Sequence, residues 1–470
     1  MSGINKKLIF NAFAMNTPVH LSPGQWKDPE DTSTSFQDLE HWTELAKVLE
    51  EGKFNALFIA DVLGAYDVHN GNKDSAVRTG AQFPIHSPEL IVPAMAAVTK
   101  NLAFGITQST SYEHPFNVAR RFSTLDHLTK GRVAINIVTS YLDSAARNHG
   151  LPEQIDHDER YKRADEFMDV LYKLWESSWS DNAKTLDKEK DQYYDPALVH
   201  EINHEGEYFK CAGPHITEPS IQRTPLVFQA GSSGPGQEFA AKHSEAVFLW
   251  GSDVNHLAKK VKSLRDLSEK LGRGRDGIKA IAGANVIVAE TDELAQKKFE
   301  DLRANATKEG ALVLLGGWTG NDFGKFTEDD ELRLVQSNAI KSTVETYAQR
   351  HNDKDSKWTK SKLATHASVG GVHPNIVGSP STVADIIEEW IKVCDIDGFN
   401  FGYATKPGTF IDLVKYVFPE LRRRGLHWDD YPSSNDGRAN LTARESYFGT
   451  GNKRLPENHY GNKFKYENVH

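Results

Sequence analysis

Short apolar runs alternate with longer amphipathic segments along most of the chain. The runs are continuous instead of alternating with polar residues, which is typical of strands that are covered on both faces. These predicted strands lie at 7–13, 56–61, 102–109, 132–140, 225–231, 245–251, 278–288 and 398–404. The intervening segments have helical periodicity and span 36–51, 87–98, 116–128, 158–177, 235–243, 254–271, 291–305 and 382–394.

The number of alternations distinguishes between two architectures. Strands that alternate with helices predict a parallel sheet covered by helices. An open doubly wound sheet fits this order, but eight repeats favour a closed (β/α)8 TIM barrel. We therefore expect one α/β barrel domain over 1–430, with long polar, turn-rich insertions at 180–223 and 306–380. Residues 431–470 are polar with scattered aromatic residues, and we expect a C-terminal extension that wraps the surface or a partner subunit.

Composition and charge exclude several classes of protein. The 470 residues carry a formal net charge of −10, which argues against a general nucleic-acid binder. Two cysteines provide no disulfide framework and predict a reducing, cytoplasmic environment. No apolar stretch approaches the ~18 residues of a membrane-spanning helix.

A barrel of this kind places its chemistry at the carboxyl ends of the strands. The residues there are mostly hydroxyls and amides: Met15, Asn16, Thr17, His20, Asp61, Tyr66, Thr107, Gln108, Ser109, Thr139, Ser140, Tyr141, Gly231, Ser232 and Ser233. They include neither the paired carboxylates of a glycosidase nor the histidines and aspartates of a metal hydrolase. This set favours a cofactor that supplies its own reactivity.

Two segments are candidates for binding a phosphate. "QAGSSGPG" at 229–236 follows the fifth strand but matches neither the P-loop nor the dinucleotide-binding glycine pattern. A phosphate-binding loop of the barrel and a plain tight turn are both open here. "HDERY" at 157–161 is predicted to begin a helix, with Asp158 as the N-cap. Helix N-termini favour anions, although ordinary capping also explains this segment.

The segment "HEINH" at 200–204 matches the zinc-protease pattern H-E-x-x-H. Pro196 and Gly206 leave room for only two or three helical turns, and the segment lies outside the strand ends. We therefore expect a structural hairpin or a short helix here and no metal site.

Several motifs taken together resemble one family. They are "FNAFAMN", "FIADV", "TQSTSYEHPFNVARRFSTLDHLTKGR", "NIVTS", "HDERYKRADEF" and "QAGSSGPG". They resemble the flavin-dependent monooxygenases of the bacterial-luciferase superfamily. The branch is that of nitrilotriacetate monooxygenase component A, dibenzothiophene-sulfone monooxygenase and long-chain alkane monooxygenase. The resemblance runs from about residue 5 to 430, with short echoes in the tail.

This resemblance implies a (β/α)8 barrel that uses reduced FMN as a co-substrate, supplied by a separate NAD(P)H:FMN reductase. Reduced FMN and O2 would give a C4a-(hydro)peroxide that oxygenates a small organic substrate. Members of the family assemble as homodimers or homotetramers. A deazaflavin-dependent oxidoreductase and a non-catalytic flavin-binding protein on the same barrel are the alternatives.

The resemblance also implies roles for individual residues. Predicted contacts with the flavin ring, ribityl chain and phosphate are Asp61, Thr107, Ser140, His157, Tyr161, Ser232 and Ser233. Predicted hydrogen bonds to the peroxide or the substrate come from His20, Tyr66, Gln82 and Tyr141. The insertion at 306–380 is a candidate lid. Thr17 and Tyr141 depart from the alkane branch, which has Cys and His there, and this favours the sulfone and amine-acid branches without choosing the substrate.

Overall fold

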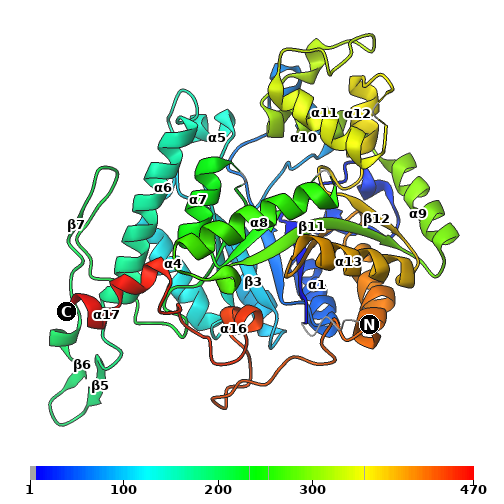
Figure 1. Ribbon diagram of the computed structural model, residues 1–470. Coiled ribbons are helices and arrows are strands. Elements are labelled where there is room, and N and C mark those ends of the chain that lie inside the picture. The colour runs from blue at the N-terminus through cyan, green and yellow to red at the C-terminus, as the bar shows by residue number, and fades with distance from the viewer. Residues whose placement is uncertain (1–6, 232, 252, 354) are drawn as a thin grey trace.

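Eight parallel strands form a closed barrel in the computed structural model, which describes residues 7–231, 233–251, 253–353 and 355–470 (Figure 1). The strands are β1 (Ile9–Met15), β2 (Ala56–Ala60), β3 (Ala103–Ser109), β4 (Val133–Val138), β9 (Leu226–Gln229), β10 (Ala246–Leu249), β11 (Lys279–Val288) and β13 (Gly398–Gly402). The ring closes because β10 pairs with β11, β11 with β13, and β13 with β1. The predicted (β/α)8 barrel is confirmed, and every barrel strand falls within a predicted run or overlaps it closely.

Helices surround the barrel (Figure 1). The principal ones are α1 (Leu39–Gly52), α3 (Val92–Ala97), α4 (Pro115–Leu128), α6 (His157–Tyr172), α7 (Gly234–His243), α8 (Val254–Lys270), α9 (Asp292–Asn305) and α13 (Pro380–Cys394). The prediction of Asp158 as the N-cap of α6 is wrong. Asp156 caps this helix, and its carboxylate accepts hydrogen bonds from the backbone N–H groups of Asp158 and Glu159.

The two faces of each strand meet different apolar surroundings. On β1, Phe10, Ala12 and Ala14 belong to the core between the barrel and its helices. The neighbouring Ile9 belongs instead to the core inside the barrel, together with Phe58. Both faces are therefore apolar, which explains the continuous hydrophobic runs in the sequence.

The first insertion consists of two small hairpins. Strand β5 (Lys184–Asp187) pairs with β6 (Gln192–Tyr194), and β7 (His204–Glu205) pairs with β8 (Lys210–Cys211). The two histidines of "HEINH" lie outside any helix and have different partners: His200 Nε2 lies 2.8 Å from Tyr466 Oη, and His204 Nε2 lies 3.1 Å from Glu166 Oε1. Within the described part of the chain, no group of three or more metal-ligating side chains is arranged to hold an ion.

The second insertion differs from the polar, turn-rich segment expected. It contains α10 (Lys308–Thr319), α11 (Asn338–Arg350), α12 (Lys360–Ala367) and β12 (Asn375–Gly378), and β12 pairs with the end of β11. The helices share a hydrophobic core of their own, to which Leu315, Tyr347 and Trp358 belong. These three helices lie above the barrel in Figure 1.

The C-terminal extension packs against the chain's own barrel. Its helix α16 (Ala443–Phe448) contributes Ala443 and Tyr447 to the core inside the barrel. Tyr447 Oη donates a hydrogen bond of 2.7 Å to Asn11 Oδ1 on β1. Arg444 forms an ion pair with Glu245, which precedes β10, at 2.7 Å, and both side chains are almost completely buried. The extension therefore helps to fill one end of the barrel.

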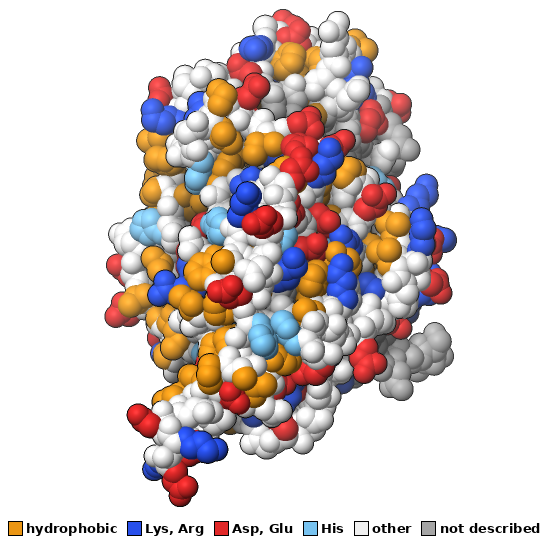
Figure 2. Space-filling model, turned by 90° about the vertical axis from the view of Figure 1, so that its left-hand side faces the viewer, with side chains coloured by type: hydrophobic (Ala, Val, Ile, Leu, Met, Phe, Trp, Pro, Cys, Tyr) orange, Lys and Arg blue, Asp and Glu red, His pale blue; other side chains and the backbone are white. Residues whose placement is uncertain are grey.

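The molecular surface carries no extensive single-sign patch on the face shown in Figure 2, where acidic and basic side chains are interspersed. Of the helices in the described residues, none combines the length and apolar character needed to cross a bilayer.

Replacing Arg444 with Ala should destabilise the fold strongly, because Glu245 would be left as a buried and unpaired carboxylate. We expect a loss of about 3–5 kcal/mol in the free energy of unfolding, measured by urea denaturation. The control is Arg423→Ala, since Arg423 forms an exposed pair with Glu420 and should have little effect. Equal stability of the two variants would contradict this role of the C-terminal extension.

Candidate functional site

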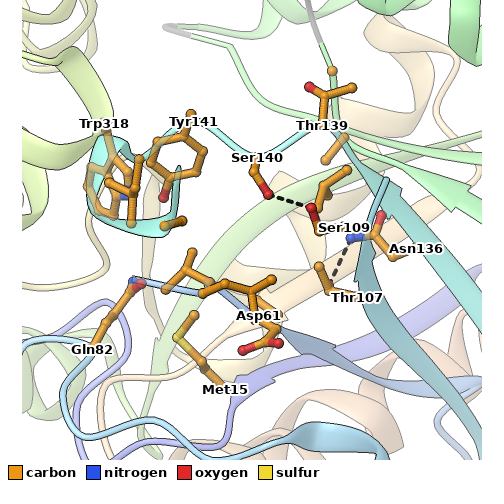
Figure 3. Close-up of a pocket in the computed structure, with 18 of the residues that line it drawn as sticks. Met15, Asp61, Gln82, Thr107, Ser109, Asn136, Thr139, Ser140, Tyr141 and Trp318 are labelled. Carbon is orange, nitrogen blue, oxygen red and sulfur yellow. Dashed lines mark hydrogen bonds between the residues drawn. The ribbon is translucent and has the colours of Figure 1, made fainter. Parts of the chain in front are cut away.

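A cavity of about 480 Å³ lies at the carboxyl ends of the barrel strands. Strands β1, β2, β3, β4 and β9, with the loops that follow them, supply most of its lining. Figure 3 shows the side chains of Met15, Asp61, Thr107 and Ser140 gathered around it. The cavity therefore lies where the barrel architecture predicted the chemistry.

The cavity brings together nearly all of the predicted site residues. Its lining includes His20, Asp61, Tyr66, Gln82, Thr107, Ser140, Tyr141, His157 and Tyr161. Ser233 is described but serves as the N-cap of α7, where its Oγ accepts a 3.2 Å hydrogen bond from the backbone N–H of Gly236. Ser232 lies outside the described residues. The placement of these side chains is now known, whereas their functional roles stay predictions.

Asp61 follows the last residue of β2 and has an unusual proton affinity. Burial, together with the nearby charges of Glu89 and Glu113, raises the pKa of its carboxyl to about 7, against a hydrogen bond from the backbone N–H of Val62. At neutral pH this group can therefore either donate or accept a proton.

Polar side chains from β3 and β4 are linked in pairs beside Asp61 (Figure 3). Asn136 Nδ2 donates to Thr107 Oγ1 at 2.9 Å, and Asn136 Oδ1 has no partner among the described residues. The hydroxyls of Ser109 and Ser140 lie 2.8 Å apart. Ser140 has left-handed backbone geometry, with φ of 57°, which turns the chain sharply after β4.

Two tyrosines and a tryptophan form an aromatic wall. The hydroxyls of Tyr66 and Tyr141 are hydrogen-bonded to each other. Although 44% of Tyr141 is exposed, burial around its hydroxyl raises its pKa to about 12, and the pKa of Tyr66 is also well above its ordinary value. Both phenols therefore stay protonated and can donate hydrogen bonds. Trp318 of α10 lies beside Tyr141 (Figure 3).

His20 and Gln82 leave two buried polar atoms without partners. Gln82 Nε2 donates to the backbone carbonyl of His20 at 3.1 Å, while Gln82 Oε1 and His20 Nδ1 have no partner within the described residues. The His20 ring packs edge-on against Phe13, with 4.5 Å between centroids. Burial, helped by His373 and Lys406, holds the pKa of His20 well below its ordinary value, so this imidazole is neutral.

The two candidate phosphate segments meet at Tyr161. A methyl group added at Gly231 or at Gly236 would come within 2.7 Å of Tyr161 Oη, so this hydroxyl lies against the glycine-rich loop. His157 and Arg160, from the first turn of α6, line the same cavity. An anion held here would be close to the N-termini of both α6 and α7 and to one guanidinium group.

These groups fit a flavin nucleotide. The site combines a corner suited to an anion, where Arg160 and the N-termini of α6 and α7 meet, with amide oxygens on Asn136, Gln229 and Gln82 that have no partner among the described residues. A buried amide oxygen without a partner is costly in free energy, and a ligand that donates hydrogen bonds would remove that cost. The edge of an isoalloxazine ring carries such donors beside acceptors.

Several lining residues were missed by sequence reasoning. Asn136 and Gln229 lie inside strands whose motifs were recognised, so the alternation of side chains along a strand was an available signal. Trp318 and His373 come from the second insertion, and Trp250 follows β10. The insertion was predicted to be a lid, but nothing local in the sequence indicates which of its residues line the cavity.

Comparison with known proteins was consistent with this geometry. The family described as "Luciferase-like monooxygenase" matches residues 14–394. Dimethyl-sulfide monooxygenase of Hyphomicrobium sulfonivorans is 44% identical over 95% of each chain, and its crystal structure superposes with a TM-score of 0.92 over 99% of this chain and 97% of that one. Long-chain alkane monooxygenase of Geobacillus thermodenitrificans is 45% identical over 98% of this chain and 99% of the relative. A crystal structure of long-chain alkane monooxygenase gives a TM-score of 0.88, with 98% of this chain and 100% of that one covered. A riboflavin lyase solved with modified FMN and riboflavin is 33% identical, with a TM-score of 0.87 over 98% of this chain and 100% of that one.

Replacing Asp61 with Asn should stabilise the protein at high pH. The folded-state pKa of about 7 exceeds the ordinary 3.8, so stability is lost as the pH rises towards 7 and Asp61 ionises inside the fold. The variant escapes this loss, and we expect a gain of about 1–3 kcal/mol at pH 8.5 and a much smaller gain at pH 5. Denaturation at both pH values measures the effect. Asp38→Asn, an exposed carboxylate at the start of α1, is the control and should show no such pH dependence.

Proposed function

We propose that this chain, which belongs to the luciferase-like monooxygenase family, is the oxygenase of a two-component system. It binds reduced FMN supplied by a separate NAD(P)H:FMN reductase, takes up O2 and oxygenates a small organic substrate. We expect the working unit to be a homodimer or homotetramer. The observation that carries the proposal is the cavity, which combines an anion-binding corner, unpaired amide oxygens and apolar walls.

The chain's own residues hold the cofactor in this scheme. Tyr161 and Arg160, with the backbone of the loop at Ser233, bind the phosphate at the N-termini of α6 and α7. Asn136 accepts a hydrogen bond from the ring edge, and Asp61 exchanges a proton there at neutral pH. When bound, reduced FMN supplies the electrons that activate O2, with one oxygen atom entering the substrate and the other leaving as water.

Residues at the aromatic wall keep water out. Trp318 and Tyr141 cover one side of the cavity. In the hydrogen-bonded pair of Tyr66 and Tyr141, one protonated hydroxyl donates to the other, which in turn donates a hydrogen bond to the reacting oxygen. His20 and Gln82 contact the substrate through their unpaired atoms. Exclusion of water matters because it protects reactive oxygen species from wasteful breakdown.

The lining favours an uncharged substrate. Arg160 is the one Lys or Arg side chain among the described lining residues, and it belongs to the phosphate corner. Arg78 and Arg147 do not line the cavity and are paired with Glu309 and Asp67. A polycarboxylate would therefore lack a counter-charge in the cavity. The named substrates of two relatives, dimethyl sulfide and long-chain alkanes, are uncharged.

The function can be tested by reconstitution. The purified protein, FMN, NADH and an unrelated flavin reductase are incubated with a panel of dialkyl sulfides, sulfones, alkanes and aminopolycarboxylates. We expect O2 uptake and an oxygenated product, identified by mass spectrometry, from uncharged members only. Hydride transfer with reduced deazaflavin but no oxygenation would instead identify a deazaflavin-dependent enzyme. FMN binding without turnover of any compound would favour a non-catalytic flavin-binding protein.

Removing the Tyr161 hydroxyl should weaken the binding of FMN. In Tyr161→Phe, the dissociation constant for FMN should rise about 5–10-fold, the equivalent of one lost hydrogen bond. Quenching of FMN fluorescence measures this constant. Tyr208→Phe is the matched control. The Tyr208 hydroxyl donates to Glu159 on α6, the helix that carries Tyr161, but Tyr208 does not line the cavity. Unchanged FMN affinity in Tyr161→Phe would show that this hydroxyl does not bind the phosphate.

A further inference from the structure

His373 is a buried histidine that the second insertion contributes to the cavity. It precedes β12, lines the cavity beside Val372 and is 7% exposed. Its Nδ1 atom is buried and has no hydrogen-bond partner in the described part of the chain. Most buried polar atoms are paired, so an unpaired nitrogen on a side chain that lines the cavity points to a hydrogen bond with a ligand there.

Hydrogen bonds from β11 and from α11 hold the loop that carries His373. Asn285 on β11 donates from its backbone N–H to the carbonyl of Pro374 at 2.9 Å and from Nδ2 to the carbonyl of Gly370 at 3.1 Å. Arg350 Nη2 donates to the carbonyl of Val372 at 2.9 Å. The backbone beside His373 is therefore held in place.

The barrel leaves space for the imidazole of His373. Gly283 on β11 faces the ring, and a methyl group added there would lie 2.7 Å from Nε2. Phe13 packs against both cavity histidines, with ring centroids 4.5 Å from His20 and 5.7 Å from His373. The ring of Trp250 lies 6.4 Å away. The imidazole is thus a polar group among aromatic side chains.

This imidazole is also uncharged at neutral pH. Burial, followed by the positive charge of Arg350, lowers its pKa to about 4. It can therefore offer one hydrogen bond without attracting carboxylates.

We propose that His373 binds the organic substrate by a hydrogen bond to a polar atom of an uncharged molecule, such as the oxygen of a dialkyl sulfone. This inference rests on the proposed function. It narrows the substrate class to uncharged compounds with a hydrogen-bonding heteroatom, in preference to plain alkanes. A hydrogen bond in an apolar setting contributes more to discrimination than a methylene contact, because its loss leaves both partners unpaired.

Two substitutions separate hydrogen bonding from packing. His373→Phe keeps an aromatic ring but removes both nitrogens, whereas His373→Gln keeps a hydrogen-bonding side chain. His351→Phe is the control, since His351 lies in the same insertion at the end of α11 and does not line the cavity. If His373→Phe fails to fold, Gly283→Ala displaces the ring without removing it.

Equilibrium binding to the FMN-loaded protein is the first readout, with diethyl sulfone and pentane as probes. We expect His373→Phe, or Gly283→Ala in its place, to weaken sulfone binding about tenfold. Pentane and FMN binding should stay within about twofold. His373→Gln should recover most of the sulfone affinity, and His351→Phe should match the wild type.

Turnover distinguishes failure of this inference from failure of the proposed function. If the wild type oxygenates a sulfide or sulfone, His373→Phe should raise KM with FMN affinity unchanged. Wild-type sulfone affinity in His373→Phe, or an equal loss for sulfone and pentane, would overturn the inference whatever the activity. An absence of wild-type turnover, with sulfone binding still dependent on His373, would count against the proposed function alone.

Discussion

Closure of the parallel barrel is the constraint on which the rest of the structure depends. Because every barrel strand runs in the same direction, the pairing of β10 with β11 and of β13 with β1 brings all the carboxyl ends to one rim. Residues that are hundreds of positions apart then line one cavity. The opposite end of the barrel receives α16, whose Arg444 neutralises the buried Glu245. The chemistry is thus confined to one side of the molecule.

Burial at this rim makes the site poor in charge. Desolvation moves the pKa of Asp61 up to about 7 and those of His20 and His373 down, so each group favours its neutral form. The polar atoms that remain are amides, hydroxyls and imidazoles, several of which lack a partner within the described residues. Such a site suits a cofactor that brings its own reactivity and a substrate without charge.

The second insertion forms part of the site. Its helices have a separate hydrophobic core, yet Trp318 and His373 reach the cavity. Asn285 ties the insertion to β11, so the position of His373 depends on a barrel residue. This arrangement allows the insertion to shape the substrate end while the barrel holds the cofactor.

The sequence by itself determined the eight strands, the barrel and most of the cavity residues. Continuous apolar runs mark strands buried on both faces, and the carboxyl-end rule then selects residues such as Asp61, Thr107 and Tyr141. Tertiary structure alone decided that Tyr161 Oη lies against Gly231, that Ser233 caps α7 and that "HEINH" leads into a hairpin instead of forming a helix. It alone placed Trp318 and His373 in the cavity. The periodicity of the sequence indicates which residues are buried. Contacts between distant segments depend on the paths that the loops take across the rim, and periodicity does not indicate those paths.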